Sequence, residues 1–332
     1  MIAPRFWARE RPGLAARALQ PLGALYGLAT ARRMARPGVQ VEAAVVCVGN
    51  FVVGGAGKTP TAIAVARMLQ GAGERVAFLS RGYGGAARAE PIEVDAAIQG
   101  AHAVGDEPLL LARIAPCFVG ADRVAAARLA IARGASALVL DDGLQNPSLV
   151  KDFTFAVIDG EARFGNGLTF PAGPLRAPAE RQLPFVSAEI VVGGPPETLA
   201  ALRAPAARKP IFRAELEADA IVGAKLVGRP VFAFAGIARP EKFFATLEAL
   251  GARVAAKRSF ADHHAYAPRE IEALIAEAAA RGLTLATTEK DYVRLAPAHR
   301  QAIVALPVTL RFDTPEPVAT LLRQALARRR AL

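Results

Sequence analysis

A glycine-rich segment near residue 55 contains the residue types that bind the phosphates of a nucleotide. Glycines let backbone N–H groups approach the phosphates closely, a lysine can reach the β- and γ-phosphates, and a threonine hydroxyl can ligate Mg²⁺. The usual P-loop has a glycine six residues before its lysine, and this chain has Val52 there. We expect this segment to bind a nucleoside triphosphate whose terminal phosphate is transferred to another molecule. The binding residues expected are Val52, Val53, Gly54, Gly55, Ala56, Gly57, Lys58 and Thr59.

Two adjacent carboxylates, Asp141 and Asp142, follow the apolar run 137–140. A buried strand that ends in aspartate is typical of phosphate-transferring sites, where the carboxylate holds Mg²⁺ directly or through water. Because consecutive side chains point in different directions, one aspartate can hold metal while the other orients a substrate or a side chain. The alternative is an ordinary turn with solvated acidic residues.

A second acidic pair, Asp106 and Glu107, precedes an apolar helical run at 109–113. Acidic side chains are favoured at the start of a helix because the helix dipole is positive there, so the pair can be purely structural. Alternatively, the two carboxylates supply a catalytic base and a metal ligand.

Three further segments carry groups that could act on a phosphate or a proton. Arg81 lies beside a glycine-rich stretch after an expected strand, and Arg176 ends the long irregular loop 165–176, from which it could clamp a phosphate. His263 and His264 follow an aspartate and could transfer protons or bind metal. A plain glycine-rich turn and a structural histidine pair are the alternatives.

Apolar runs and helical segments alternate around these residues. A strand is expected at 42–48, directly before the glycine-rich segment, and a helix at 61–70, directly after it. Further elements are expected as strands at 75–80, 137–140, 155–159 and 189–192 and a helix at 121–133. This pattern predicts an α/β fold, a P-loop NTPase-like and mostly parallel sheet with helices on both faces. Ligands of such sheets bind at the carboxyl ends of the strands.

The chain has 332 residues, which is enough for two domains. The segments expected are a basic N-terminal segment at 1–38, a P-loop domain at 39–207, a smaller α/β domain at 208–314, and a C-terminal helix at 315–332 that packs back on the first domain. The boundary is placed in the stretch 204–210, which is rich in proline, alanine and basic residues. The smaller domain should have strands at 231–234, 253–259 and 284–287, helices at 240–250 and 268–281, and paired hinge strands at 211–217 and 307–312.

The composition, 53% hydrophobic and 21% charged, excludes a disordered chain. The net charge of +11 indicates an anionic partner: nucleic acid, an anionic membrane or a phosphorylated substrate. Aromatic residues make up only 6% and we find no base-reading motif, so no nucleic-acid partner is expected. The two cysteines, Cys47 and Cys117, cannot form a disulfide framework and favour a reducing compartment.

The first 36 residues contain seven arginines and a single acidic residue, Glu10. Between the arginines, the uncharged stretch 18–31 is shorter than the roughly 20 apolar residues that span a bilayer. Such a helix can lie in the interface of an anionic membrane or pack as an ordinary amphipathic helix. A signal peptide is a third interpretation, disfavoured because the nucleotide site that follows requires intracellular ATP.

Eight segments of the chain occur in an order that is typical of one family. They are Gly49-Asn50 with GGAGKTP, SRGYGG, VGDEP, DDGLQ, GNG with PAGPLR, FAGIARPEKFF, DHHAY and TTEKDYVRL. On these motifs the chain resembles the tetraacyldisaccharide 4'-kinases of lipid A biosynthesis over about residues 45–295. The ordered set is far more specific than any one motif.

The resemblance implies ATP and Mg²⁺ as cofactors, and the 4'-hydroxyl of a lipid disaccharide 1-phosphate as the acceptor, giving the bis-phosphorylated lipid A precursor. It implies that Lys58 and Thr59 hold the triphosphate and Mg²⁺. It also implies that Asp106 accepts the hydroxyl proton, with His263 as its partner in a dyad, chosen because it directly follows Asp262; His264 is the alternative. The roles that remain are charge stabilisation by Arg176, organisation of metal and phosphate by Asp141, Asp142 and Glu107, and substrate contacts from Asn50, Arg81 and Gln145.

The same resemblance implies a peripheral protein on the cytoplasmic side of the inner membrane, docked by its N-terminal helix and without an obligate protein partner. Because His263 and Asp106 are expected in different domains, catalysis would require domain closure. The alternative function is that of a P-loop GTPase or metallochaperone-type NTPase. Guanine-binding proteins usually carry Asn-Lys-x-Asp, and the nearest string here, at 288–291, has the wrong order.

Overall fold

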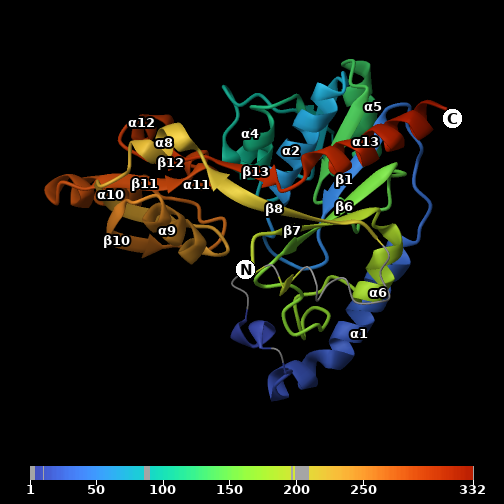
Figure 1. Ribbon diagram of the computed structural model, residues 1–332, viewed down its shortest axis with the longest axis horizontal. Helices are drawn as coiled ribbons and strands as arrows, with labels where there is room; N and C mark the ends of the chain where they lie inside the picture. The colour runs from blue at the N-terminus through green and yellow to red at the C-terminus, as the bar shows by residue number, and fades with distance from the viewer. Residues whose placement is uncertain (1–3, 10, 86–89, 196, 199–208, 332) are drawn as a thin grey trace.

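The computed structural model describes residues 4–9, 11–85, 90–195, 197–198 and 209–331. Within these residues the strands form two sheets, one of nine strands and one of four. Figure 1 shows the two sheets, each with its own helices, at opposite ends of the long axis of the molecule. The expected boundary at 204–210 lies mostly outside the described residues, so the division at residue 207 stays a prediction.

The larger sheet has the strand order β13-β8-β7-β6-β1-β5-β2-β4-β3. Its edge strands, β3 and β13, are antiparallel to their neighbours, and the other neighbouring pairs are parallel. This confirms the predicted mostly parallel sheet. The strands are β1 Ala44–Gly49, β2 Val76–Ser80, β3 Ile92–Glu93, β4 Cys117–Val119, β5 Ala137–Asp141, β6 Phe153–Asp159, β7 Ala188–Val192, β8 Ile211–Ala218 and β13 Val308–Phe312.

Helices cover both faces of this sheet, as the fully buried strand β1 requires. Val46 and Val48 pack in the cluster that contains α2 (Lys58–Gly71), α4 (Asp106–Leu111) and α13 (Pro315–Arg330). Val45 and Cys47, on the alternate face, pack with α5 (Arg123–Ala132). The short helices α3 (Ala101–Val104), α6 (Ala179–Gln182) and η2 (Leu183–Phe185) lie in connections at the sheet.

The smaller sheet is parallel and has the order β10-β9-β11-β12. Alternate residues of β9 (Pro230–Ala235) pack on opposite faces of this sheet: Val231 and Ala233 toward α9 (Pro240–Ala249), and Phe232 and Phe234 toward α10 (Pro268–Ala280). The elements are β9 Pro230–Ala235, β10 Arg253–Ser259, β11 Thr284–Thr288, β12 Val304–Leu306, α8 Ala220–Ala224, α9 Pro240–Ala249, α10 Pro268–Ala280, α11 Glu289–Tyr292 and α12 Pro297–Arg300.

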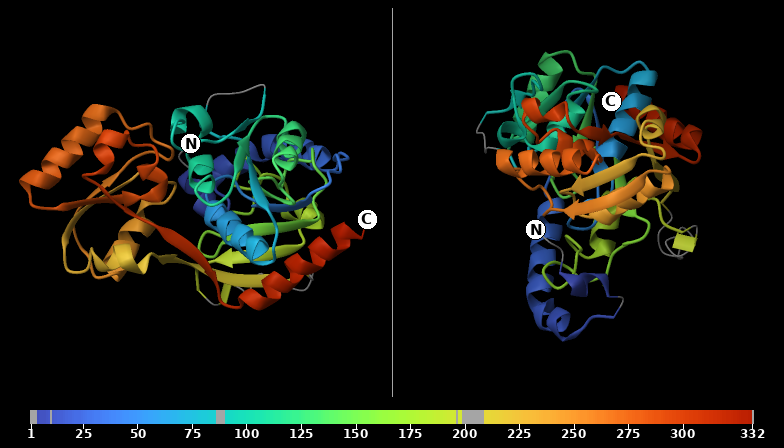
Figure 2. Two further views of the ribbon diagram at one scale, coloured as in Figure 1. Left: turned by 90° about the horizontal axis from the view of Figure 1, so that it is seen from above. Right: turned by 90° about the vertical axis from the view of Figure 1, so that its left-hand side faces the viewer.

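A two-stranded connection joins the sheets. β8 leads from the larger sheet into α8, and β13 returns from β12, the two pairing antiparallel from Ala218–Val308 to Ala214–Phe312. Figure 2 shows this ribbon running between the two bodies in the view from above. The smaller sheet with its helices is therefore attached by two chain crossings, an arrangement that permits hinge motion.

The N-terminal helix α1 (Leu14–Met34) is longer than the uncharged stretch that predicted it, and η1 (Arg5–Ala8) precedes it. Its glycine face packs tightly: a Cβ at Gly27 would lie 3.0 Å from Pro178 and Thr169. Other side chains of α1 are exposed, namely Leu14, Leu22, Leu25, Tyr26 and Leu28. Figure 2 shows this helix projecting from the body of the molecule. Among the described helices, none is both long and apolar enough to cross a membrane.

Candidate active site

The P-loop begins where β1 ends and closes on the first turn of α2. Gly57 has a φ of 84°, a left-handed conformation that glycine adopts without strain, and α2 starts at the next residue. The side chain of Lys58 folds back over the loop, so that Nζ donates to the Gly54 carbonyl at 2.9 Å. Lys58 is only 9% exposed, which holds its charge inside the loop, where phosphates would bind.

The two aspartates at the end of β5 face the P-loop and have different partners. Thr59 Oγ1 donates to Asp141 Oδ2 at 3.1 Å, whereas Asp142 Oδ2 accepts from Arg176 Nη2 at 2.8 Å and lies 3.8 Å from Lys58 Nζ. Burial, together with the charges of Glu107 and Asp142, raises the pKa of Asp141 to about 7. Burial acts in the same direction on Asp142, but the charges of Lys58 and Arg176 lower its pKa overall.

The pair Thr59 and Asp141 fits Mg²⁺. Asp141 Oδ1 is buried and has no hydrogen-bond partner, which leaves a carboxylate oxygen available for a cation. Carboxylate and hydroxyl oxygens are the donors that Mg²⁺ prefers, and it usually takes one or two carboxylates and completes its shell with phosphate and water. The described residues contain no group of three or more His, Cys, Asp or Glu side chains that could hold a metal ion.

The irregular loop that ends in Arg176 is joined to the P-loop by backbone and side-chain bonds. Val52 pairs with Leu175 in an antiparallel bridge, and Arg176 Nε donates to the Val52 carbonyl at 2.9 Å. This pairing explains the valine where a P-loop usually has glycine, because the residue here adopts a strand-like position. Arg176 therefore links the nucleotide loop to Asp142, 34 residues away in sequence.

Two of the expected substrate residues, Asn50 and Gln145, lie beneath the P-loop. Asn50 Nδ2 donates to the Gly54 carbonyl, and Gln145 Nε2 donates to the Asn50 carbonyl and to Gln182. Both residues are buried, and these contacts are with the nucleotide loop and its support. Arg81, the third, is exposed after β2. Their contact with substrate stays a prediction.

A histidine–aspartate pair joins the two parts of the molecule. His263 Nδ1 lies 3.1 Å from Asp106 Oδ2, with Asp106 at the start of α4 and His263 in the loop after β10. His263 has a φ of 58°, and its N–H donates to the Gly236 carbonyl at 3.1 Å. His264 points elsewhere, to Glu270 at 3.0 Å. Of the two histidines, His263 is therefore the one that contacts Asp106.

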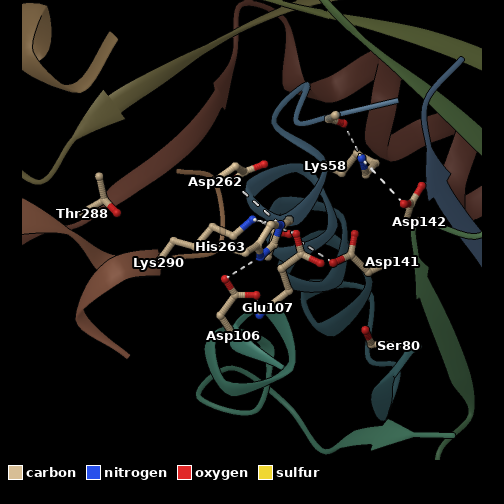
Figure 3. Close-up of polar contacts among 12 residues, drawn as sticks. Lys58, Ser80, Asp106, Glu107, Asp141, Asp142, Asp262, His263, Thr288 and Lys290 are labelled. Atoms are coloured by element: carbon tan, nitrogen blue, oxygen red, sulfur yellow. Dashed lines mark hydrogen bonds and ion pairs between the residues drawn. The ribbon is translucent and has the colours of Figure 1, made fainter. Parts of the chain in front are cut away.

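Two cations of the second domain also reach this acidic pair. Lys290 Nζ lies 3.1 Å from Glu107 Oε1 and 3.4 Å from His263 Nε2, and Arg294 donates to Asp106 Oδ2. Burial would raise the pKa of Asp106, but the His263 hydrogen bond and the charges of Lys290 and Arg294 hold it well below its usual range. Figure 3 shows Asp106, Glu107, His263 and Lys290 gathered on one side of Asp141, with Lys58 and Asp142 on the other.

Sequence reasoning assigned no role to Lys290 or Arg294. The only signal was the motif TTEKDYVRL, in which the two basic side chains are four residues apart. This spacing places both on one side of a helical turn, but nothing local indicates that they face Asp106 and Glu107 more than 180 residues earlier.

A second ionic contact joins the two bodies at the end of β6. Asp159 accepts from Arg239 Nη1 at 3.0 Å and from Lys242 Nζ at 2.9 Å, and both bases also pair with Glu161. Asp159 is largely buried, whereas the two bases are more than one-third exposed. We call this group, Asp159, Glu161, Arg239 and Lys242, the interdomain latch. These contacts join the same two bodies that meet where His263 contacts Asp106.

Replacing Asp159 with asparagine should weaken this latch. Because solvent screens the exposed bases, the expected loss of kcat/KM is only about two- to fivefold. Added salt should reduce the activity of the wild-type protein toward that of the variant, since salt screens the same contact. Initial rates at low and high ionic strength measure both effects. An Asp159→Asn variant with the wild-type rate and the wild-type salt dependence would show that the interdomain latch does not influence closure.

Comparison with known proteins identifies a family model, related sequences and a solved structure that resemble this chain. The family model described as tetraacyldisaccharide-1-P 4'-kinase matches residues 15–327. The tetraacyldisaccharide 4'-kinase of Methylobacterium sp. (strain 4-46) is 56% identical over 328 residues, covering 98% of this chain and 97% of that protein. The protein of the same name from Bradyrhizobium sp. (strain ORS 278) is 46% identical, with 100% of both chains covered. The crystal structure of Aquifex aeolicus LpxK in complex with ATP shares the fold, with a TM-score of 0.74, 23% identity, and coverage of 94% of this chain and 100% of that one.

Proposed function

This chain belongs to the tetraacyldisaccharide 4'-kinase family, and from that premise we propose how its residues phosphorylate the lipid. The reaction transfers the γ-phosphate of ATP to the 4'-hydroxyl of tetraacyldisaccharide 1-phosphate, in lipid A biosynthesis. The observation that carries the proposal is the 3.1 Å contact between His263 and Asp106, placed at the same edge of the sheet as the P-loop lysine.

The P-loop binds ATP through its backbone N–H groups, with Lys58 against the β- and γ-phosphates. Thr59 and Asp141 are the residues that would hold Mg²⁺, with Glu107 and Asp142 close by. When bound, Mg²⁺ neutralises charge on the phosphate oxygens and helps to align the γ-phosphate. Asp142 orients the side chains of Lys58 and Arg176, so that both positive charges face the γ-phosphate during its transfer.

Asp106 acts as the base. As the 4'-oxygen forms its bond to the γ-phosphorus, the hydroxyl proton passes to the Asp106 carboxylate, and the bond from phosphorus to the bridging oxygen of ADP breaks. His263 orients this carboxylate through its contact with Oδ2, which leaves the proton on Asp106. Because His263 belongs to the second domain, closure assembles the pair and excludes water from the γ-phosphate.

The acceptor lies with its acyl chains in a bilayer, so the enzyme must work at a membrane surface. The exposed apolar side chains of α1, together with the arginines of the N-terminal segment, suit an interfacial helix on an anionic membrane. Packing of its glycine face against residues 169–178 fixes this helix to the loop that leads to Arg176. We propose peripheral attachment to the cytoplasmic face of the inner membrane through α1.

Substituting glutamate for Leu25 should lower binding to vesicles of mixed zwitterionic and anionic lipid about tenfold. The change removes an apolar contact with the membrane worth roughly 1.4 kcal/mol and adds a repelled charge. Leu25 is 67% exposed, so folding should be unaffected. Co-sedimentation with vesicles measures the binding, with Ile221→Glu, a similarly exposed apolar position on α8, as the control. Equal losses in the two variants would argue against α1 as the docking element.

The function is tested by transfer of ³²P from [γ-³²P]ATP to purified tetraacyldisaccharide 1-phosphate in detergent micelles. The expected result is labelled lipid that depends on the protein, on Mg²⁺ and on the acceptor. Hydrolysis of ATP without labelled lipid would contradict the proposal and leave a P-loop NTPase with another acceptor.

A further inference from the structure

The carboxylate of Asp106 has a second partner from the second domain besides His263. Arg294 donates to Asp106 Oδ2 from Nε, at 2.8 Å, and from Nη2. Both side chains are almost fully buried, with 6% of Arg294 and 3% of Asp106 exposed. A charge pair so deeply buried must be oriented well to offset the cost of removing it from water, and a two-pronged contact provides that geometry.

Arg294 is held in turn by Asp291. Nη1 of Arg294 donates to Asp291 Oδ1 at 2.9 Å and to the Gly236 carbonyl at 2.8 Å. The completely buried Asp291 also accepts hydrogen bonds from the Gly236 N–H and from the hydroxyls of Tyr266 and Thr288. Since all of these partners belong to the second domain, the planar guanidinium meets Asp106 in one orientation.

Gly236 contacts both residues of the second domain that reach Asp106, namely His263 and Arg294. Its carbonyl accepts from Arg294 Nη1 and also from the backbone N–H of His263. A Cβ at this position would lie 2.8 Å from the Tyr266 hydroxyl and 3.0 Å from Asp291 Oδ1, so a side chain would displace the network. One backbone carbonyl therefore sets the relative position of His263 and Arg294.

We propose that Arg294, oriented by Asp291, is a positioning residue that holds Asp106 Oδ2 together with His263 and leaves Oδ1 for the acceptor hydroxyl. Oδ1 accepts one hydrogen bond, from the Glu107 N–H at 2.9 Å, and retains a second acceptor site. Because both partners of Oδ2 come from the second domain, the base acquires its working orientation only on closure. The inference rests on the proposed function, with Asp106 as the base.

The test compares Arg294→Gln and Arg294→Lys with wild type in the ³²P-lipid assay, using the full chain. Arg294→Gln should lower kcat about 10- to 100-fold, because a small misplacement of a reacting group is costly, and should leave the KM for ATP within about twofold. Arg294→Lys keeps the positive charge but lacks the guanidinium that donates two hydrogen bonds to Asp106 Oδ2. Its kcat should therefore lie between those of Arg294→Gln and wild type. Arg281→Gln is the matched control, an exposed arginine of the same domain that pairs with Glu277.

A second comparison in the Asp106→Ala background distinguishes positioning from a separate contribution. If Arg294 acts through Asp106, adding Arg294→Gln to Asp106→Ala should lower the residual rate by less than about twofold. A double variant whose loss equals the product of the two single losses would overturn the proposal, as would a wild-type kcat in Arg294→Gln.

If Arg294→Gln does not fold, Tyr266→Phe removes one hydrogen bond to Asp291. An unchanged kcat in that variant would then overturn the proposal. Absence of lipid phosphorylation by wild type and Arg281→Gln would instead contradict the proposed function.

Discussion

Asp106→Asn is expected to lower the turnover of lipid phosphorylation by about 10²- to 10⁴-fold, the usual range for loss of a general base. Asparagine keeps the size of the side chain but cannot accept the hydroxyl proton. The depressed pKa of Asp106 keeps the wild-type carboxylate ionised throughout the neutral range, which a general base requires, although the same shift makes it a weaker base. The KM for ATP should stay within about twofold, because in this structure Asp106 contacts His263 and Arg294 and makes no bond to the P-loop.

The measurement is the steady-state rate of lipid labelling, with melting temperature as a check of folding. Asp95→Asn serves as the matched control, since Asp95 is exposed and its amide replacement can still accept from the Ala97 N–H. Asp106→Asn with more than half of the wild-type turnover would show that another group accepts the proton.

Lys58→Met is expected to cost about 10²- to 10³-fold in turnover, similar to removal of one preorganised electrostatic group from other active sites. The charge of Lys58 is held in place before substrate binds, by its bond to the Gly54 carbonyl and by Asp142 at 3.8 Å. Methionine fills similar space but carries no charge, so the γ-phosphate loses a cation that the loop had already positioned.

The rate should be measured at saturating ATP, together with ATP affinity by equilibrium dialysis, so that binding and transfer are separated. Lys225→Met is the control, because Lys225 is exposed in the second domain, far from the P-loop in sequence. If Lys58→Met lost affinity but kept its turnover, the lysine would contribute to binding of ATP and not to the transfer step.

Much of the P-loop body could be predicted from the chain alone. β1, α2 and β5 are found close to their expected ranges, because burial on both faces requires continuous apolar strands and the glycines allow the tight turn from strand to helix. The strand boundary differed slightly: β1 begins at Ala44 and not at residue 42, since the first two residues form a bend. Motif order was sufficient to indicate the family.

The N-terminal helix could be predicted only in part. Its apolar and basic residues left two interpretations open, a helix packed on the protein and a helix at a membrane. The structure shows that Gly23 and Gly27 pack on the body while Leu22 and Leu25 stay exposed, so the two are compatible. Side-chain size decides this, because only small residues allow the close approach that leaves the larger side chains facing outward.

The sequence by itself determined the nucleotide loop, the parallel sheet and the existence of a second α/β unit, because each depends on residues that are neighbours in the chain. Only the tertiary structure decided which histidine meets Asp106, why Val52 replaces a glycine, and that Lys290 and Arg294 close on the acidic pair. These contacts join residues more than 100 positions apart. Those of His263, Lys290 and Arg294 form because the two sheets, connected by β8 and β13, place their loops at one edge, whereas the Val52–Leu175 pairing lies within the larger body. Local patterns carry no information about how two such bodies dock.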